Sequence, residues 1–191
     1  MVMSLYLDGC SMTHGHGLPR DQSLGKLFAN IGEYNVTDKS RNGKSNISIA
    51  LDAYKHADKC EVFVLGFTYS SRFGLEYDSK NLDFYNGFHG NGVEDVDQEI
   101  ENEFMHVYKY FYLTFGPPYS DQLSDMLVDY TISFLKSKNK KIFCFAWEHR
   151  DTNASLFYPY YGVEDRLPDG HLNKNGTYKL FNHIQENLGA E

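Results

Sequence analysis

The chain has 191 residues, of which 41% are hydrophobic and 23% charged, and these values suit one globular domain with a sizeable core. Its formal net charge of −8 argues against a general nucleic-acid partner, which needs a basic face, and gives no support for an anionic membrane as partner. Three widely spaced cysteines, Cys10, Cys60 and Cys144, predict buried free thiols rather than a disulfide framework or a zinc ribbon.

The sequence shows neither an early apolar stretch after a basic one nor a run of ~20 apolar residues. We therefore expect no signal peptide and no transmembrane segment. Free thiols fit a reducing compartment, so the expected location is the cytoplasm or a particle.

Short apolar runs predict buried strands, and apolar residues at helical spacing predict helices. We expect Pro117 and Pro118 to end the first of two long helices and Ser120 to cap the second. In chain order the expected elements are strand 4–8, helix 21–34, strand 33–38, helix 44–58, strand 61–67, an irregular stretch 69–94, helices 96–115 and 121–136, strand 141–147 and helix 173–188.

The expected strands alternate with helices and are continuously hydrophobic, which is typical of a parallel sheet covered on both faces. The sequence therefore predicts a single domain over residues 1–191, an α/β/α sandwich of three layers with four or five parallel strands. Ligand sites in such sheets lie at the carboxyl ends of the strands. Residues 9–11, 66–71 and 147–150 follow or end strands, and 168–176 precedes the last helix, so all four segments are candidates for this rim.

Ser11 follows the first strand directly, and it can act as a nucleophile only beside a base that a third group orients. His171, with Asp169 two residues earlier, is the best candidate pair. Gly43, in a turn before a helix, could offer an unhindered N–H to an oxyanion. Ser11 could instead be an ordinary turn residue or helix cap.

Four short blocks, spread from residue 5 to about residue 184, resemble the SGNH (GDSL-like) hydrolases, a family of serine esterases and acetyl-transferring relatives. Gly9, Cys10 and Ser11 stand where that family has Gly-Asp-Ser with the serine as nucleophile. The sequence RNGKSN (41–46) matches the second block, which supplies a glycine N–H, here that of Gly43, to the oxyanion hole.

The last two blocks depart from the family pattern. In LGFTYSSR (65–72), Gly66 matches, but Thr68 stands where the family has an asparagine that donates to the oxyanion. In DGHLNKNG (169–176), Asp169 and His171 are separated by one residue instead of two, and Leu172 replaces a proline.

The resemblance implies a flavodoxin-like SGNH hydrolase fold and an ester hydrolase that works through an acyl-enzyme. It implies that Ser11 is the nucleophile, His171 the general base and Asp169 its orienting group, with the oxyanion held by the N–H groups of Ser11 and Gly43 and by Thr68. No cofactor or metal is needed. The expected partner is a small-molecule or carbohydrate ester, with O-acetyl groups on carbohydrate as one candidate, and the oligomeric state stays open. The alternatives are a weak or inactive protein of the same fold that binds glycans or has a structural role, and an acyltransferase.

The loop after Ser11 allows two further interpretations. His14 and His16, together with Asp8, suggest a metal site, but a catalytic zinc needs a third protein ligand and the sequence indicates none. His14 could instead line the loop or contact substrate.

Arg72 could bind an anionic group of the substrate or pair with Glu76 at the surface. Aromatic residues could line a cleft for a sugar or acyl group or simply pack a long loop. They are Phe84, Tyr85, Phe88 and residues 158–161.

Overall fold

The computed structural model describes residues 2–77, 80–85, 89–91 and 98–189. Four strands form the parallel central sheet that the sequence predicts, and their order is β2-β1-β3-β7. Their bounds are β1 Met3–Gly9, β2 Tyr34–Asp38, β3 Val62–Phe67 and β7 Lys141–Ala146.

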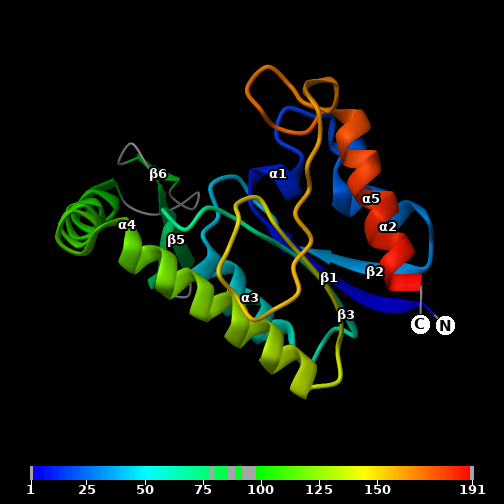
Figure 1. Cartoon of the computed structure of the whole chain (residues 1–191), viewed down its shortest axis with the longest axis horizontal. Coiled ribbons are helices and arrows are strands. Elements are labelled where there is room, and N and C mark those ends of the chain that lie inside the picture. The colour runs from blue at the N-terminus through cyan, green and yellow to red at the C-terminus, as the bar shows by residue number, and fades with distance from the viewer. Residues whose placement is uncertain (1, 78–79, 86–88, 92–97, 190–191) are drawn as a thin grey trace.

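Helices cover both faces of this sheet, which confirms the three-layer α/β/α arrangement (Figure 1). Side chains of α2 (Leu24–Asn30) and α5 (Lys174–Gly189) pack on one face, and those of α3 (Asn46–His56) and the second half of α4 (Gln98–Ser137) pack on the other. Successive residues of a strand point to opposite faces, so a strand covered on both sides must be apolar throughout. Thus Leu5 and Leu7 lie in the core with α2 and α5, whereas Tyr6 lies in the core with α3 and α4.

The region that the sequence analysis treats as irregular contains a second, antiparallel sheet. Its strands are β4 Phe73–Tyr77, β5 Lys80–Tyr85 and β6 His89–Asn91. The expectation for 69–94 was therefore wrong over these residues. The missed signal is a period of two in the sequence, with Phe73, Leu75 and Tyr77 on one strand, of which Phe73 and Leu75 are in register with Phe84 and Leu82 on the next.

The two long helices expected around Pro117 form α4, which is interrupted at Gly116. Gly116 has φ 68° and ψ −179°, outside the helical region. Pro117 follows as the first residue of the second helical segment, where the backbone N–H that proline lacks has no partner within the helix. Ser120 therefore lies inside that segment, and its expected role as a helix cap is wrong.

Shorter helical turns complete the rim of the sheet: α1 Ser11–His14, η1 Arg20–Gln22 and η2 Val163–Asp165. The single helix expected over 21–34 is divided between η1 and α2, with Ser23 between them. Within the described parts of the chain, no helix has the length and apolar character needed to cross a membrane.

Candidate active site

Ser11 lies at the carboxyl end of β1, in the first turn that follows the strand. Cys10 is still extended, Ser11 begins α1, and Gly15 ends α1 in a left-handed conformation with its N–H donating to the Ser11 carbonyl. The turn fits closely on the sheet because β1 and β3 both have glycine beneath it. A Cβ on Gly9 or on Gly66 would collide with the hydroxyl of Thr13 in α1. These two glycines therefore set the height of Ser11 above the sheet.

His171 comes from the loop before α5 and meets Ser11 across 160 positions of sequence. Its Nε2 atom lies 2.9 Å from the Ser11 Oγ atom, within hydrogen-bonding distance. Gly170 in the same loop has φ 87°, a left-handed conformation that glycine adopts without strain. The structure thus brings together a hydroxyl and an imidazole that the sequence analysis selected as nucleophile and base.

Asp169 lies beside His171 but binds its main chain better than its ring. Its carboxylate accepts a hydrogen bond from the His171 backbone N–H at 3.1 Å. The His171 Nδ1 atom is 3.2 Å from the same carboxylate but is not aligned for a hydrogen bond, and no described residue gives it one. The backbone N–H of His171 is the main reason that the pKa of the Asp169 carboxyl is lowered. Asp169 is thus an ionised, half-exposed neighbour of the imidazole.

Thr68 follows β3. Hydrogen bonds hold its backbone, whereas its hydroxyl has no hydrogen-bond partner among the described residues. The side chain of Asn46, the first residue of α3, accepts from the Thr68 N–H at 2.7 Å and donates to its carbonyl at 2.9 Å. The guanidinium of Arg150 donates to the same carbonyl. The Thr68 Oγ1 atom is buried and has no hydrogen-bond partner among the described residues. Asn46 lies in the second block and Arg150 in a candidate rim segment, but sequence reasoning assigned no role to either side chain, because both act through a tertiary contact.

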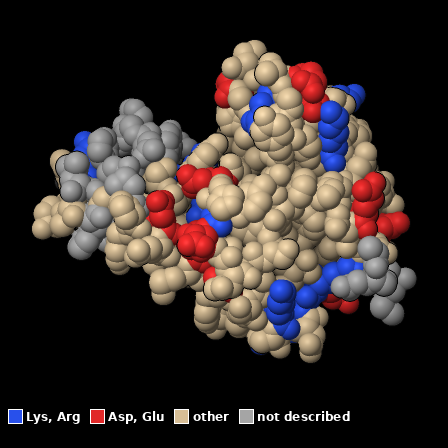
Figure 2. All heavy atoms as spheres, in the orientation of Figure 1, with Lys and Arg blue, Asp and Glu red and all other residues tan. Residues whose placement is uncertain are grey.

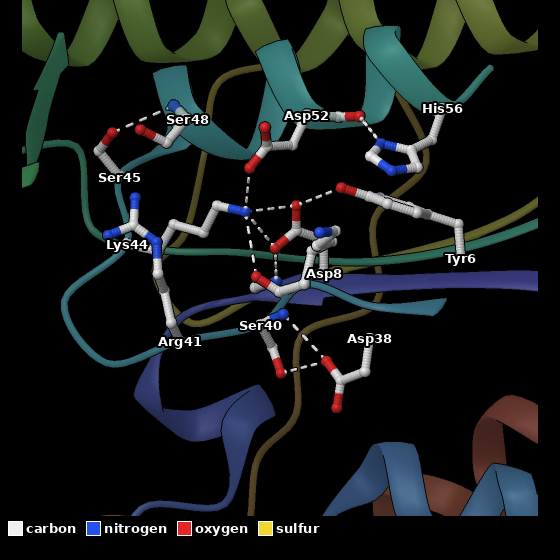
Figure 3. Close-up of polar contacts among 12 residues, drawn as sticks. Tyr6, Asp8, Asp38, Ser40, Arg41, Lys44, Ser45, Ser48, Asp52 and His56 are labelled. Carbon is white, nitrogen blue, oxygen red and sulfur yellow. Dashed lines mark hydrogen bonds and ion pairs between the residues drawn. The ribbon is translucent and has the colours of Figure 1, made fainter. Parts of the chain in front are cut away.

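Gly43 lies in a buried turn that a fully buried lysine holds against β1 (Figure 3). The Lys44 Nζ atom is 2.7 Å from both carboxylate oxygens of Asp8, 2.7 Å from Asp52 in α3 and 3.1 Å from the Lys39 carbonyl. Gly43 itself has φ 72°. The Lys44 side chain therefore ties the turn before α3 to the strand that ends at Ser11.

Asp8 is the acceptor at the centre of this network. It also accepts hydrogen bonds from the Tyr6 hydroxyl and from the Gly9 N–H, both at 2.7 Å. Burial raises the pKa of the Asp8 carboxyl to about 7, although the Lys44 ammonium acts to lower it. Asp8 thus pairs with Lys44, and the idea that it joins His14 and His16 around a metal is not supported.

A second buried carboxylate fixes the same turn from the antiparallel sheet. Asp83 of β5 accepts from the Ser45 N–H at 2.9 Å and from the Ser48 hydroxyl at 2.7 Å, and it forms an ion pair with Arg41. Figure 3 shows Ser45 and Ser48 across Lys44 from Ser40 and Asp38, and Arg41 beside the Lys44 side chain. The turn around Gly43 is thus held at both ends.

His16, in the loop after α1, also meets the segment around His171. The two imidazole rings are tilted with centroids 4.7 Å apart, and the His16 Nε2 atom is 4.0 Å from the Asp169 carboxylate. His14 does not take part: it is exposed at the end of α1 and lines a pocket of about 600 Å³ next to the nucleophile turn. That pocket also contains Arg20, Lys26 and Asp38.

The remaining candidates are less directly placed. Arg72 follows Tyr69 in a turn and lies 5.6 Å above its ring, and its Nη1 atom is buried with no hydrogen-bond partner in the described part of the chain. The alternative pairing with Glu76 concerns a side chain outside those described, and so do the proposed roles of Phe84, Tyr85 and Phe88.

On the face shown in Figure 2, Lys and Arg side chains are interspersed with Asp and Glu.

No protein-family model matches this sequence, and no curated protein matches it significantly. Solved structures do match. TesA has a TM-score of 0.52 with 12% identity, and the match covers 97% of each chain. The psychrotrophic esterase EstA from Pseudoalteromonas sp., in a structure inhibited by monoethylphosphonate, has a TM-score of 0.54 with 11% identity over 98% of this chain and 97% of that one. The chain therefore has the SGNH/GDSL-like hydrolase fold that its sequence blocks predict.

Proposed function

We propose that this chain is a serine ester hydrolase of the SGNH/GDSL type. The observation that carries the proposal is the 2.9 Å approach of the His171 Nε2 atom to the Ser11 Oγ atom at the carboxyl end of β1. In the proposed reaction His171 takes the Ser11 proton while Oγ attacks the ester carbonyl, and the protonated imidazole then returns the proton to the leaving alcohol. Water activated by His171 hydrolyses the acyl-enzyme in the second half. Asp169 supports the charge that His171 gains in each half.

The oxyanion of both steps would be held by the N–H groups of Ser11 and Gly43 and by the Thr68 hydroxyl. Two observations support this assignment. The Thr68 hydroxyl is buried and has no hydrogen-bond partner among the described residues, so we propose it as a donor. The turn of Gly43 is fixed by Lys44 and Asp83 before any substrate arrives, and donors that are already in place stabilise a transition state most effectively.

The proposed substrate is a small ester, with O-acetyl groups on carbohydrate as a candidate class. The fold neighbour EstA is described as an esterase. Two tyrosines on the loop before His171, Tyr158 and Tyr160, are exposed at 36% and 94%, and aromatic rings of this kind pack well against sugars. Cys10, Cys60 and Cys144 are all free and buried, which supports the proposal of a reducing compartment.

The direct test is hydrolysis of p-nitrophenyl acetate by the wild type and by Ser11→Ala and His171→Ala. We expect each variant to lose at least ~10³-fold in kcat, because nucleophile and base act as one unit. Ser133→Ala, on an exposed position of α4, is the matched control and should keep the wild-type rate. An aryl phosphonate should add its phosphorus to Ser11 alone, as seen by peptide mass spectrometry. Wild-type turnover by Ser11→Ala would overturn the mechanism.

A non-catalytic glycan-binding protein is the second candidate, favoured by the His171 Nδ1 atom that makes no hydrogen bond to Asp169. In that case the phosphonate would leave Ser11 unmodified, and acetylated oligosaccharides would bind without loss of acetate. Calorimetric titration with an acetylated xylo-oligosaccharide, followed by measurement of free acetate, separates the two candidates.

A further inference from the structure

Three metal-ligating side chains converge beside Ser11, and the ester chemistry needs only two of them. The ligand atoms of His16, Asp169 and His171 all lie within 4.8 Å of one another. They come from two loops far apart in sequence, one after α1 and one before α5. His16 and Asp169 are 46% and 50% exposed, so an ion can reach the cluster from solvent.

The nitrogen and oxygen atoms of this cluster have the right chemistry and spacing to bind a divalent transition-metal ion such as Zn²⁺. Two ligand atoms of a tetrahedral zinc site lie roughly 3.4 Å apart. In the protein the Asp169 carboxylate is 3.2 Å from the His171 Nδ1 atom and 4.0 Å from the His16 Nε2 atom. Small side-chain movements would therefore bring all three to bonding distance. The His171 Nδ1 atom is the natural ligand, since it is buried without a hydrogen-bond partner among the described residues while Nε2 faces Ser11.

We propose that His16, Asp169 and His171 form an inhibitory site for Zn²⁺ or a similar divalent transition-metal ion, with water at the fourth position. Two imidazoles and one carboxylate with an open position are a ligand set that zinc accepts. The local sequence around His16 does not reveal this site, because the other two ligands follow more than 150 positions later.

Inhibition follows from the two nitrogens of one imidazole. As a base, His171 must carry its proton on Nδ1 and present the lone pair of Nε2 to the Ser11 hydroxyl. Metal binding at Nδ1 requires the lone pair of Nδ1 itself, so the proton on Nδ1 leaves to solvent, and the ring stays neutral by taking one proton from solvent at Nε2. Nε2–H then donates to the Ser11 Oγ atom and can no longer accept its proton. Because the Asp169 carboxylate would bind the same ion, it could no longer support positive charge on the His171 imidazole.

Metal binding is tested without turnover by titrating Co²⁺, and then Zn²⁺ in competition, into Ser11→Ala. We expect a d–d spectrum typical of four-coordination, and an affinity at least ~10-fold weaker in Ser11→Ala carrying His16→Gln, because one ligand is lost. The matched control is His106→Gln, which removes an exposed histidine from α4 and should leave the affinity unchanged. Equal affinity with and without His16 would overturn the site. In ¹H–¹⁵N spectra of zinc-saturated Ser11→Ala, His171 should carry its proton on Nε2; a proton on Nδ1 would overturn the assigned ligand atom.

The inhibitory consequence rests on the proposed esterase function and needs the active chain. Zn²⁺ should suppress p-nitrophenyl acetate hydrolysis by the wild type at least ~10-fold at saturation, and EDTA should restore it. His16→Gln should keep the basal rate within about twofold and should need at least ~10-fold more Zn²⁺ for the same loss. Activation by Zn²⁺, or identical inhibition of His16→Gln, would overturn the proposal. If the chain hydrolyses no ester, the esterase proposal fails and the Co²⁺ titration still decides the metal site.

Discussion

At the scale of single residues, Thr68 has a backbone that is held by hydrogen bonds and a side-chain hydroxyl with no hydrogen-bond partner among the described residues. A buried hydroxyl without a hydrogen-bond partner costs about 1–3 kcal/mol of stability. Asn46 and Arg150 hold the Thr68 main chain, and no residue in the described part of the chain bonds to the Thr68 hydroxyl. Thr68 stands where the SGNH pattern has an asparagine, and its hydroxyl is the oxyanion donor that we propose.

Replacing Thr68 should therefore separate stability from activity. Thr68→Val keeps the shape and removes only the hydroxyl, so we expect kcat on p-nitrophenyl acetate to fall by ~10²-fold with KM nearly unchanged. The urea midpoint should stay equal or rise, because a buried unpaired polar group is removed.

Thr68→Ser, which keeps the hydroxyl, is the control and should retain most of the rate. A Thr68→Val variant with wild-type kcat would show that the oxyanion is held by the backbone N–H groups alone.

Ser11 and His171 could be identified from the sequence because each follows or precedes a recognisable element at the sheet rim. The structure places the His171 Nε2 atom 2.9 Å from the Ser11 Oγ atom. His16 could not be identified as a neighbour of His171, since nothing in its local sequence shows which loop it will face. The Asp8–Lys44 ion pair was also beyond sequence reasoning, because a lysine is normally expected at the surface.

At the scale of elements, the turn that contains Gly43 depends on one buried positive charge and two carboxylates. Lys44 bridges Asp8 of β1 and Asp52 of α3. Breaking such a network by removing one partner leaves an uncompensated buried charge. The network therefore holds the start of α3 on the end of β1, next to Ser11.

The pKa of Asp8 predicts how this network affects stability with pH. Its folded-state pKa of about 7 lies above the ordinary value of 3.8, so between these limits the folded state holds a proton that the unfolded state has lost. The stabilisation from that proton is complete below pH 4 and is lost as pH rises towards 7. The unfolding free energy of the wild type should therefore fall relative to Asp8→Asn by up to ~1.4 kcal/mol per pH unit in this window.

Urea denaturation at pH 4.5, 5.5, 6.5 and 7.5 measures this difference. Asp58→Asn removes an exposed carboxylate and serves as the control, which should run nearly parallel to the wild type. Parallel curves for Asp8→Asn and the wild type would show that Asp8 has the same pKa in both states.

The elements of the parallel sheet could be predicted because each strand is a continuous apolar run between turn signals. Bounds differ from those expected by only a few residues, as for α3 at Asn46–His56 against 44–58. The antiparallel strands β4 to β6 were missed because Gly, Asn and charged residues alternate with the apolar ones and mimic a loop. Their anchor, the buried Asp83, looks like a surface residue until its partners on α3 are seen.

At the scale of the whole molecule, the parallel sheet of order β2-β1-β3-β7 brings segments from early and late in the chain to one rim. Ser11 comes from the first strand and His171 from the loop before the last helix, so the site exists only when the sheet has formed. The antiparallel sheet joins this unit through Asp83, which contacts the turn before α3 and its first residues. We propose on these grounds that residues 1–191 fold as a single domain.

A single domain predicts one cooperative unfolding transition. Trp147, the only tryptophan, follows β7 and packs edge-on against Phe145, so its fluorescence reports the parallel sheet. Far-UV circular dichroism is weighted towards α4, the longest helix described. Since β3, β7 and α4 share one core, both signals should give the same urea midpoint. Two separated midpoints would mean that α4 and the antiparallel sheet unfold apart from the parallel sheet, and esterase activity should then follow the tryptophan signal, because Ser11 and His171 are placed by that sheet.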